Sequence, residues 1–108
     1  MKNIEKYMRQ AIKEAYKAWD IDEVPIGCVI VKDDKVIARG HNIRETKKSP
    51  IGHAEIVAIN KASKKLNNWR LEDCDIYITV EPCIMCSGAI IQSRIRHVYF
   101  GAYDPIHL

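Results

Sequence analysis

The sequence predicts a single α/β domain of three layers, with helices packed on both faces of a central mixed sheet. Its patterns follow the order helix, two strands, helix, strand, helix, strand. Strands that alternate with helices imply crossover connections, which place the helices on the faces of a sheet. The length of 108 residues fits one domain over residues 1–108, and no internal repeat or linker divides it.

The composition is that of a soluble folded domain, with 47% hydrophobic and 29% charged residues. No apolar run approaches the roughly 20 residues that a membrane-spanning helix needs, and the chain starts with an amphipathic pattern rather than a signal peptide. We therefore expect a cytoplasmic protein without membrane contact. The net charge of +3 is compatible with a nucleic-acid partner but does not argue for one.

The first half of the chain predicts a helix followed by a strand hairpin. Apolar residues recur with a period of 3.6 over residues 4–19, and the face expected to be buried carries these side chains: Ile4, Met8, Ala11, Ile12, Ala15 and Trp19. Pro25 prevents the helix from continuing. The apolar run 26–31 and the segment 36–40 predict two strands, joined by the polar turn 32–35.

The second half predicts a loop over residues 42–52, a helix over 53–66 and a strand over 75–80. A helix over 83–92, a strand within 95–100 and a tail without a clear pattern over 101–108 follow. In the second helix we expect Ile56, Ile59 and Ala62 to point inward. Pro82 stands at the start of the third helix, where its missing N–H has no cost. The polar loop is a candidate substrate-facing segment, since loops on a rigid scaffold often carry function.

Three side chains near the predicted helix starts have the character of metal ligands. Cys83 and Cys86 are three residues apart, so a helix places both thiols on one face, one turn apart. The partial positive charge of a helix N-terminus favours thiolates there. His53 begins the preceding helix, and the strand between the two helices brings both helix starts to the same sheet edge. Cys28 and Cys74 are expected to be structural.

The expected metal is Zn²⁺, because imidazole and thiolate are ligands that it prefers. Three protein ligands leave the fourth position for water, as in catalytic zinc sites, and zinc lowers the pKa of that water from about 16 to about 7. Glu55 lies two residues after His53, so the two side chains diverge on a helix. We expect Glu55 to face the water and to act as the catalytic proton shuttle.

The pattern of His53 and Glu55 followed by Pro82-Cys83 and Cys86 is the known signature of the zinc-dependent nucleobase deaminases. Longer segments resemble the bacterial tRNA adenosine deaminases, in order, over residues 24–104: V-P-I-G-C-V-I-V, G-H-N, H-A-E-I-V-A-I, T-V-E-P-C-I-M-C-S-G-A-I and S-R-I-R-H-V-Y-F-G-A-Y-D. This resemblance implies a cytidine-deaminase-like fold, and hydrolytic deamination of adenosine to inosine at the wobble position of a tRNA.

The resemblance also implies partners and further site residues. The family's zinc ligands match the three residues singled out above: His53, Cys83 and Cys86. Asn42 matches a residue that contacts the adenine base, Ala54 one whose N–H adjoins the reacting centre, and Asp104 one that meets the sugar. Members of the family are usually homodimers, and the tRNA anticodon loop touches both subunits.

One departure from the family keeps other functions open. Beyond residue 104 the family continues with a loop and a C-terminal helical segment that is missing here. The alternatives are a deaminase of a free base or nucleoside, such as guanine or cytosine, and an inactive truncated fragment that binds zinc. For Arg44 and the adjacent Lys47-Lys48, contact with RNA phosphates and a solvated loop are both open interpretations.

Overall fold

The computed structural model describes residues 2–102. Its helices and strands follow the predicted order: α1 (Lys2–Asp20), β1 (Gly27–Lys32), β2 (Lys35–His41), α2 (Ala54–Leu66), β3 (Cys74–Ile78), α3 (Ile84–Gln92) and β4 (His97–Phe100). The last strand begins two residues later than predicted, and both α2 and α3 begin one residue later. Within the described residues, no helix has both the length and the apolar character needed to cross a membrane.

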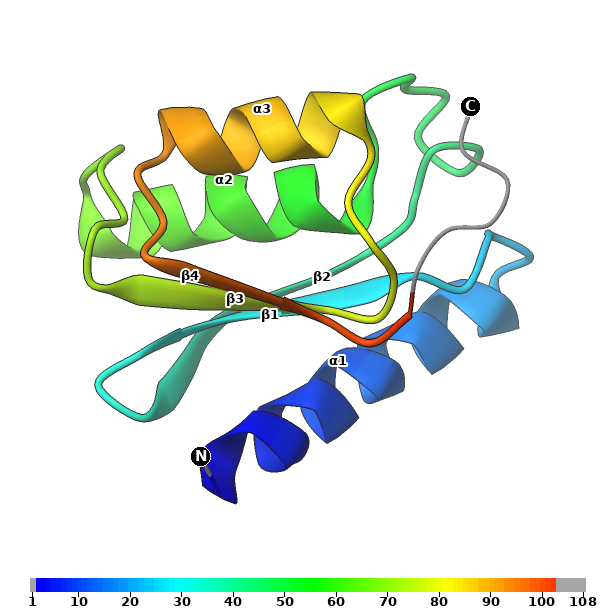
Figure 1. Ribbon diagram of the computed structural model, residues 1–108. Coiled ribbons are helices and arrows are strands. Elements are labelled where there is room, and N and C mark those ends of the chain that lie inside the picture. The colour runs from blue at the N-terminus through cyan, green and yellow to red at the C-terminus, as the bar shows by residue number, and fades with distance from the viewer. Residues whose placement is uncertain (1, 103–108) are drawn as a thin grey trace.

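The four strands form one mixed sheet in the order β2-β1-β3-β4. β1 is antiparallel to both of its neighbours, whereas β3 and β4 are parallel and are joined by the crossover helix α3. Figure 1 shows α2 and α3 on one face of the sheet and α1 on the other. The predicted three-layer α/β/α arrangement with a mixed sheet is therefore confirmed.

The hairpin between β1 and β2 turns on two residues, Asp33 and Asp34. Both have positive φ angles, 51° and 59°. Two consecutive left-handed residues are what a type I′ turn requires, and aspartate tolerates this region better than most residues. A bulge at Ile30/Val31 shifts the pairing register in the same hairpin.

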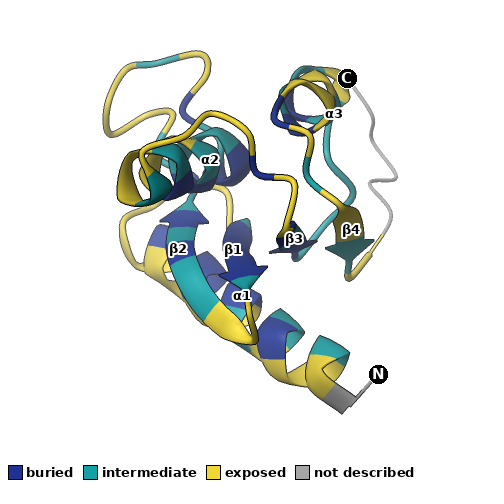
Figure 2. Cartoon of the chain, turned by 90° about the vertical axis from the view of Figure 1, so that its left-hand side faces the viewer, coloured by how far each residue is buried: buried dark blue, intermediate teal, exposed yellow. Residues whose placement is uncertain are grey.

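The buried residues form two clusters, one on each face of the sheet. Successive side chains of a strand point to opposite faces, so Cys28 and Ile30 pack toward α2 and α3 while Val29 and Val31 pack toward α1. Five of the six β1 residues are buried, which explains why this strand reads as a continuous apolar run rather than an alternation. Figure 2 shows that the buried sides of the helices face the sheet.

The predicted buried face of α1 is partly wrong. Ile12 and Trp19 are 42% and 65% exposed, and the buried positions are mostly small: Tyr7, Ala11, Glu14, Ala15 and Ala18. The physical reason is how closely α1 approaches β1. A Cβ added at Gly27 would lie 2.0 Å from the Ala11 carbonyl oxygen, so the contact has no room for large side chains.

A similar constraint refines the prediction for α2. Its fully buried residues form the stripe Ala54, Ala58 and Ala62, which confirms Ala62 as inward. Ile59 is partly buried and packs against the core, whereas the partly buried Ile56 is not part of that cluster. A Cβ added at Gly40 of β2 would lie 2.3 Å from the Ala54 carbonyl oxygen. Alanine at the contact positions thus allows α2 to lie directly on the sheet.

Replacing Gly27 with alanine should destabilise the fold strongly, because its Cβ would meet backbone atoms of α1 that cannot move independently. We expect the free energy of unfolding to fall by more than about 2 kcal/mol, measured by urea denaturation. The matched control is Gly88→Ala in α3, where an added Cβ has no atom within 4 Å. That variant should gain about 0.5–1 kcal/mol from helix propensity. Equal midpoints for the two variants would contradict the close approach of α1.

Candidate active site

The N-termini of α2 and α3 meet at one end of the sheet. At this end β1 begins at Gly27, which pairs with His41 at the end of β2, while Cys28 pairs with Ile78 at the end of β3. α2 follows β2 and α3 follows β3, so both helices start from this edge. The sequence-based expectation that the two helix starts lie together is thus met by the strand register.

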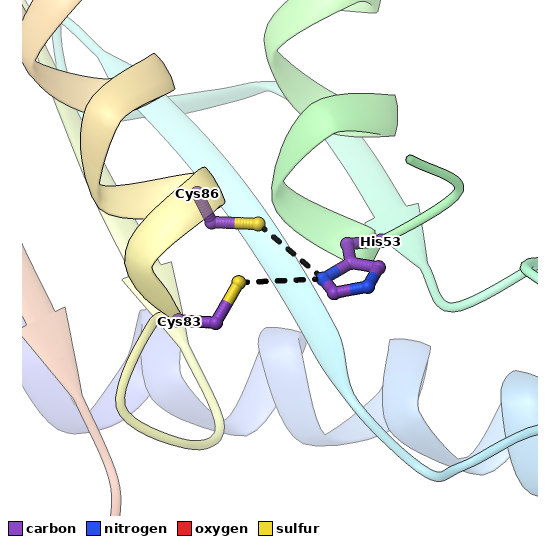
Figure 3. Close-up of side chains that lie close together, drawn as sticks. All are labelled: His53, Cys83 and Cys86. Atoms are coloured by element: carbon purple, nitrogen blue, oxygen red, sulfur yellow. Dashed lines mark hydrogen bonds between the residues drawn. The ribbon is translucent and has the colours of Figure 1, made fainter. Parts of the chain in front are cut away.

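His53 and Cys83 are the N-cap residues of these helices rather than their first turns. Both have extended backbones, with φ and ψ of −85° and 152° for His53 and −71° and 176° for Cys83. Neither side chain makes a capping hydrogen bond. The imidazole and the thiol are therefore free to face each other across the gap between the two helices, as Figure 3 shows.

His53, Cys83 and Cys86 form a compact donor set. The His53 Nδ1 lies 3.6 Å from the Cys83 Sγ and 3.6 Å from the Cys86 Sγ, and all the ligand atoms lie within 4.8 Å of one another. A tetrahedral zinc ion with ordinary Zn–N and Zn–S bonds separates its nitrogen and sulfur ligands by about 3.6 Å. The spacing and the donor types of these three side chains fit Zn²⁺.

The buried acids at this site are costly to ionise without a cation. Burial raises the pKa of the Cys86 thiol well above its ordinary value, and the nearby Glu55 carboxylate raises it further. Burial likewise raises the pKa of Glu55, which is only 3% exposed. A positive ion among the donor atoms reverses this effect on a thiol, so the electrostatics suit a metal centre.

A cavity of about 300 Å³ opens beside the donor set. Its lining comes from the segment before β1, the loop after β2, the start of α2 and the segment before α3: Val24, Ile26, Asn42, Arg44, His53, Ala54, Glu55, Val80, Glu81 and Cys83. Pockets of this size accept small molecules. Another cavity, of about 420 Å³, lies near the β1–β2 turn between Tyr7 and Tyr99, and none of the donor residues lines it.

The predicted base-contacting residues line the same cavity. Asn42 is 6% exposed, and its Oδ1 accepts a hydrogen bond from the Arg44 N–H at 3.0 Å. This bond leaves the side-chain amide nitrogen of Asn42 available for a ligand. Ala54 is fully buried as the first residue of α2, where backbone N–H groups lack partners within the helix. Asp104 lies outside the described residues.

The structure adds two features to the predicted site. Arg44, for which the sequence left phosphate contact and a solvated loop both open, lines the cavity wall. Glu23, which no sequence motif singled out, is 4% exposed and holds the loop that carries Arg44. No local pattern marks such a residue, because the backbone N–H groups that donate to its carboxylate lie 22 and 23 positions further along the chain.

Comparison with known proteins places the chain in a family. The family model described as cytidine and deoxycytidylate deaminase zinc-binding region matches residues 1–102. The chain belongs to this family. A solved structure from a study of A-to-I editing by tRNA:A34 deaminases superposes on this deaminase domain with a TM-score of 0.91 at 46% identity, covering 94% of this chain and 73% of that one. The expected cytidine-deaminase-like fold is therefore confirmed.

Among curated relatives, this chain is similar in sequence to several tRNA-specific adenosine deaminases. It is 54% identical to the one of Bacillus subtilis over 101 residues, which is 94% of this chain and 63% of the relative. It is 46% identical to the one of Aquifex aeolicus over 103 residues, 95% of this chain and 68% of the relative. The chain thus spans less than two thirds of the Bacillus relative. A guanine deaminase structure from Bacillus subtilis has a TM-score of 0.89 at 40% identity, covering 92% of this chain and 64% of that one.

The cysteines should differ sharply in reactivity when the folded protein holds no metal. We expect iodoacetamide to alkylate Cys83 first, because its thiol is partly exposed and lies at the N-terminus of α3. Cys28 and Cys74 should react only on unfolding, since both are buried and burial raises the pKa of each thiol. Peptide mass spectrometry after a short pulse measures the order, and a pulse in concentrated urea is the control. Labelling of Cys28 as fast as Cys83 would contradict the described packing.

Proposed function

We propose that this chain is the catalytic domain of a zinc-dependent enzyme that hydrolyses adenosine to inosine at the wobble position of a tRNA. The observation that carries the proposal is the convergence of His53, Cys83 and Cys86 near the buried carboxylate of Glu55. His53, Cys83 and Glu55 line one cavity. The curated relatives named tRNA-specific adenosine deaminase, similar over 94% of this chain, support the substrate class.

Three side chains would hold the zinc ion: His53, Cys83 and Cys86. When bound, zinc acts as a Lewis acid that lowers the pKa of a water molecule to about 7, and so supplies a nucleophile near neutral pH. The N-terminus of α3 supports the two thiolates through its dipole. Burial of Cys86 keeps bulk water away from one side of the donor set.

Glu55 moves the protons of the reaction. Burial raises the pKa of Glu55 toward neutral pH. A carboxyl group with such a pKa both accepts and releases protons readily. The carboxylate takes a proton from the attacking water as the new C–O bond forms at purine C6. It then passes this proton to the ring nitrogen N1. In a second transfer Glu55 takes the remaining proton from the new C6 hydroxyl and gives it to the amino group, which leaves as ammonia as the C–N bond breaks and the C6 carbonyl forms.

The walls of the cavity hold the base. The side-chain amide of Asn42 would donate a hydrogen bond to the adenine ring, and the N–H of Ala54 at the start of α2 would face the reacting centre. Asp104 would contact the sugar. A base buried inside a duplex cannot reach such a cavity, so the substrate must be a flipped or single-stranded nucleotide, as an anticodon loop offers.

A second candidate function is deamination of a free base. The guanine deaminase of Bacillus subtilis has a similar fold at 40% identity, and the same donor set suits either substrate. The higher identity to the tRNA-specific relatives favours the tRNA substrate. A third candidate is a zinc-binding protein without catalytic turnover, since the same three side chains suit a metal site whether or not a reaction follows.

The cellular form is also part of the proposal. We propose that two copies of the chain pair in the cytoplasm, as resemblance to the family suggests. The exposed apolar residues of α3 support a protein partner, since Ile84 and Ile91 are 84% and 67% exposed. Exposed apolar side chains of this size on one short helix are typical of a contact surface.

Loss of any metal ligand should abolish tight zinc binding. The wild-type chain should bind about one zinc ion, and His53→Ala, Cys83→Ala or Cys86→Ala should weaken binding by at least about 100-fold. Competition with a chelator measures affinity, and thiolate-to-cobalt absorption bands in the Co²⁺ form report the sulfur ligands. Cys74→Ala is the matched control, because it removes a buried thiol outside the donor set. Equal loss in Cys74→Ala would argue against the assigned ligands.

The activity itself is tested on an anticodon stem-loop RNA with adenosine at the wobble position. We expect zinc-loaded protein to make inosine at that base, and Glu55→Ala to lower kcat by about 10²–10⁴-fold while keeping zinc. Glu72→Gln, at an exposed carboxylate, is the control and should be unchanged.

The same protein should be offered free guanine, cytosine and adenosine. Turnover of a free base without inosine in the RNA would favour the second candidate. Zinc binding without turnover of any substrate would favour the third candidate, a zinc-binding protein without catalysis.

A further inference from the structure

The chain leaves α1 through a turn that points Glu23 into the protein. The Asp22 N–H donates to the Trp19 carbonyl at 3.1 Å, and the Glu23 N–H donates to the Ala18 carbonyl at 2.9 Å. These two bonds form the Schellman arrangement that ends many helices, with Asp22 in the left-handed region at a φ of 62°. As a result the Glu23 side chain is only 4% exposed, although glutamate is usually a surface residue.

The Glu23 carboxylate accepts three hydrogen bonds from the loop after β2. Its Oε1 accepts from the Glu45 N–H at 3.2 Å, and its Oε2 accepts from the Thr46 N–H at 2.6 Å and the Thr46 hydroxyl at 2.7 Å. Burial alone would raise the pKa of Glu23, but the bonds from Thr46 and Glu45 lower it overall. The carboxylate is therefore ionised at neutral pH, and charge-assisted bonds of this kind are strong.

The loop needs these acceptors because it contains one turn of helix. The Lys47 N–H donates to the Ile43 carbonyl at 2.9 Å, as in an α-helical turn. The first N–H groups of such a turn have no partner inside it, and here they belong to Arg44, Glu45 and Thr46. Asn42 Oδ1 accepts from the first, and Glu23 accepts from the other two. Glu23 thus completes the N-terminus of the turn.

The clamped turn forms a cationic rim of the candidate active site. Arg44 lines the cavity, and its Nε lies 3.7 Å from the carboxylate of the exposed Glu45. The Arg44 side chain is 51% exposed, so the guanidinium remains accessible. Lys47 and Lys48 follow in the same exposed turn, against one acidic side chain, Glu45. Asn42 is anchored separately, because its backbone N–H donates to the Ile26 carbonyl at 3.1 Å. Loss of the clamp should therefore loosen the turn that carries Arg44, while Asn42 stays anchored.

We propose that Glu23 is a positioning residue of this site, which holds the 43–49 turn so that the Arg44 guanidinium meets a backbone phosphate of the RNA substrate. The inference rests on the proposed function and adds to it a reason for preferring a polynucleotide over a free base. Phosphate contacts fix the register of a nucleic acid on a protein without reading its sequence. Glu23 acts on affinity for the RNA, while the chemistry stays with Glu55 and the metal ligands.

The kinetic test compares Glu23→Ala with Asp22→Asn in zinc-loaded protein acting on the anticodon stem-loop. We expect Glu23→Ala to raise KM about tenfold and to change kcat less than about twofold. The reason is that the variant loses only the ordered position of the Arg44 guanidinium, which contacts the RNA phosphate. Asp22→Asn removes a neighbouring exposed carboxylate, and asparagine tolerates a positive φ, so its kinetics should equal the wild type. Thr46→Val removes one of the three bonds and should raise KM by a smaller factor.

A double-mutant cycle separates positioning from general destabilisation. If Glu23 acts through Arg44, adding Glu23→Ala to Arg44→Gln should raise KM little beyond the Arg44→Gln value. Additive effects, or an equal KM rise in Asp22→Asn, would overturn the proposal. If Glu23→Ala fails to fold, Thr46→Val keeps the test decisive, because it leaves the buried carboxylate in place. An unchanged KM in Thr46→Val would count against the clamp.

Amide hydrogen exchange tests the clamp without any activity. The amides of Glu45 and Thr46 should be protected in the wild type and should exchange at least about tenfold faster in Glu23→Ala, while those of β1 remain unchanged. Unchanged exchange at Glu45 and Thr46 would overturn the clamp itself. A wild-type protein that makes no inosine but shows the expected exchange would overturn the proposed function and leave the clamp supported.

Discussion

Gly27 and Gly40 allow two helices to approach the sheet so closely that an added Cβ would lie 2.0 Å from the Ala11 oxygen and 2.3 Å from the Ala54 oxygen. On the α2 side this contact lies at the first turn of the helix. The short distance between Ala54 and β2 therefore fixes how far His53 lies from the sheet, and it also keeps Glu55 buried. A helix held further from the sheet would present the imidazole away from the two cysteines, so packing and ligand geometry are consequences of one steric constraint.

Burial then sets the electrostatic character of the site. Two acids that face one another in a dry environment, the Cys86 thiol and the Glu55 carboxyl, both have raised pKa values because burial disfavours their charged forms. The protein keeps these groups inside at a cost to stability, which is common at functional sites. Glu23 shows the opposite balance, since three hydrogen bonds outweigh its burial and lower its pKa. One carboxyl is thus suited to proton transfer and the other to fixed structure.

Much of this arrangement could be predicted from the sequence, because it depends on local rules. The C-x-x-C spacing keeps Cys83, the N-cap residue of α3, within about one turn of Cys86 in that helix. The periods of strands and helices predicted the order of the elements. The predictions failed where tertiary contacts decide. Ile12 and Trp19 fit the periodic face of α1 but are exposed, because the contact with β1 selects alanine. The role of Glu23 depends on partners more than 20 residues away, which no local pattern encodes.

The donor set alone does not select a substrate. Solved structures similar to this chain come from work on tRNA:A34 deaminases, on a guanine deaminase and on a diaminohydroxyphosphoribosylaminopyrimidine deaminase, with TM-scores of 0.91, 0.89 and 0.76. One architecture thus serves substrates as different as a free base and a folded RNA, and function depends on what surrounds the shared centre. In this chain the 42–52 loop contributes the Asn42 amide and the Arg44 guanidinium to the cavity wall. A free base has no phosphate for Arg44 to contact, so under the role proposed for Glu23 the ordering of this cation benefits a nucleotide substrate and not a free base.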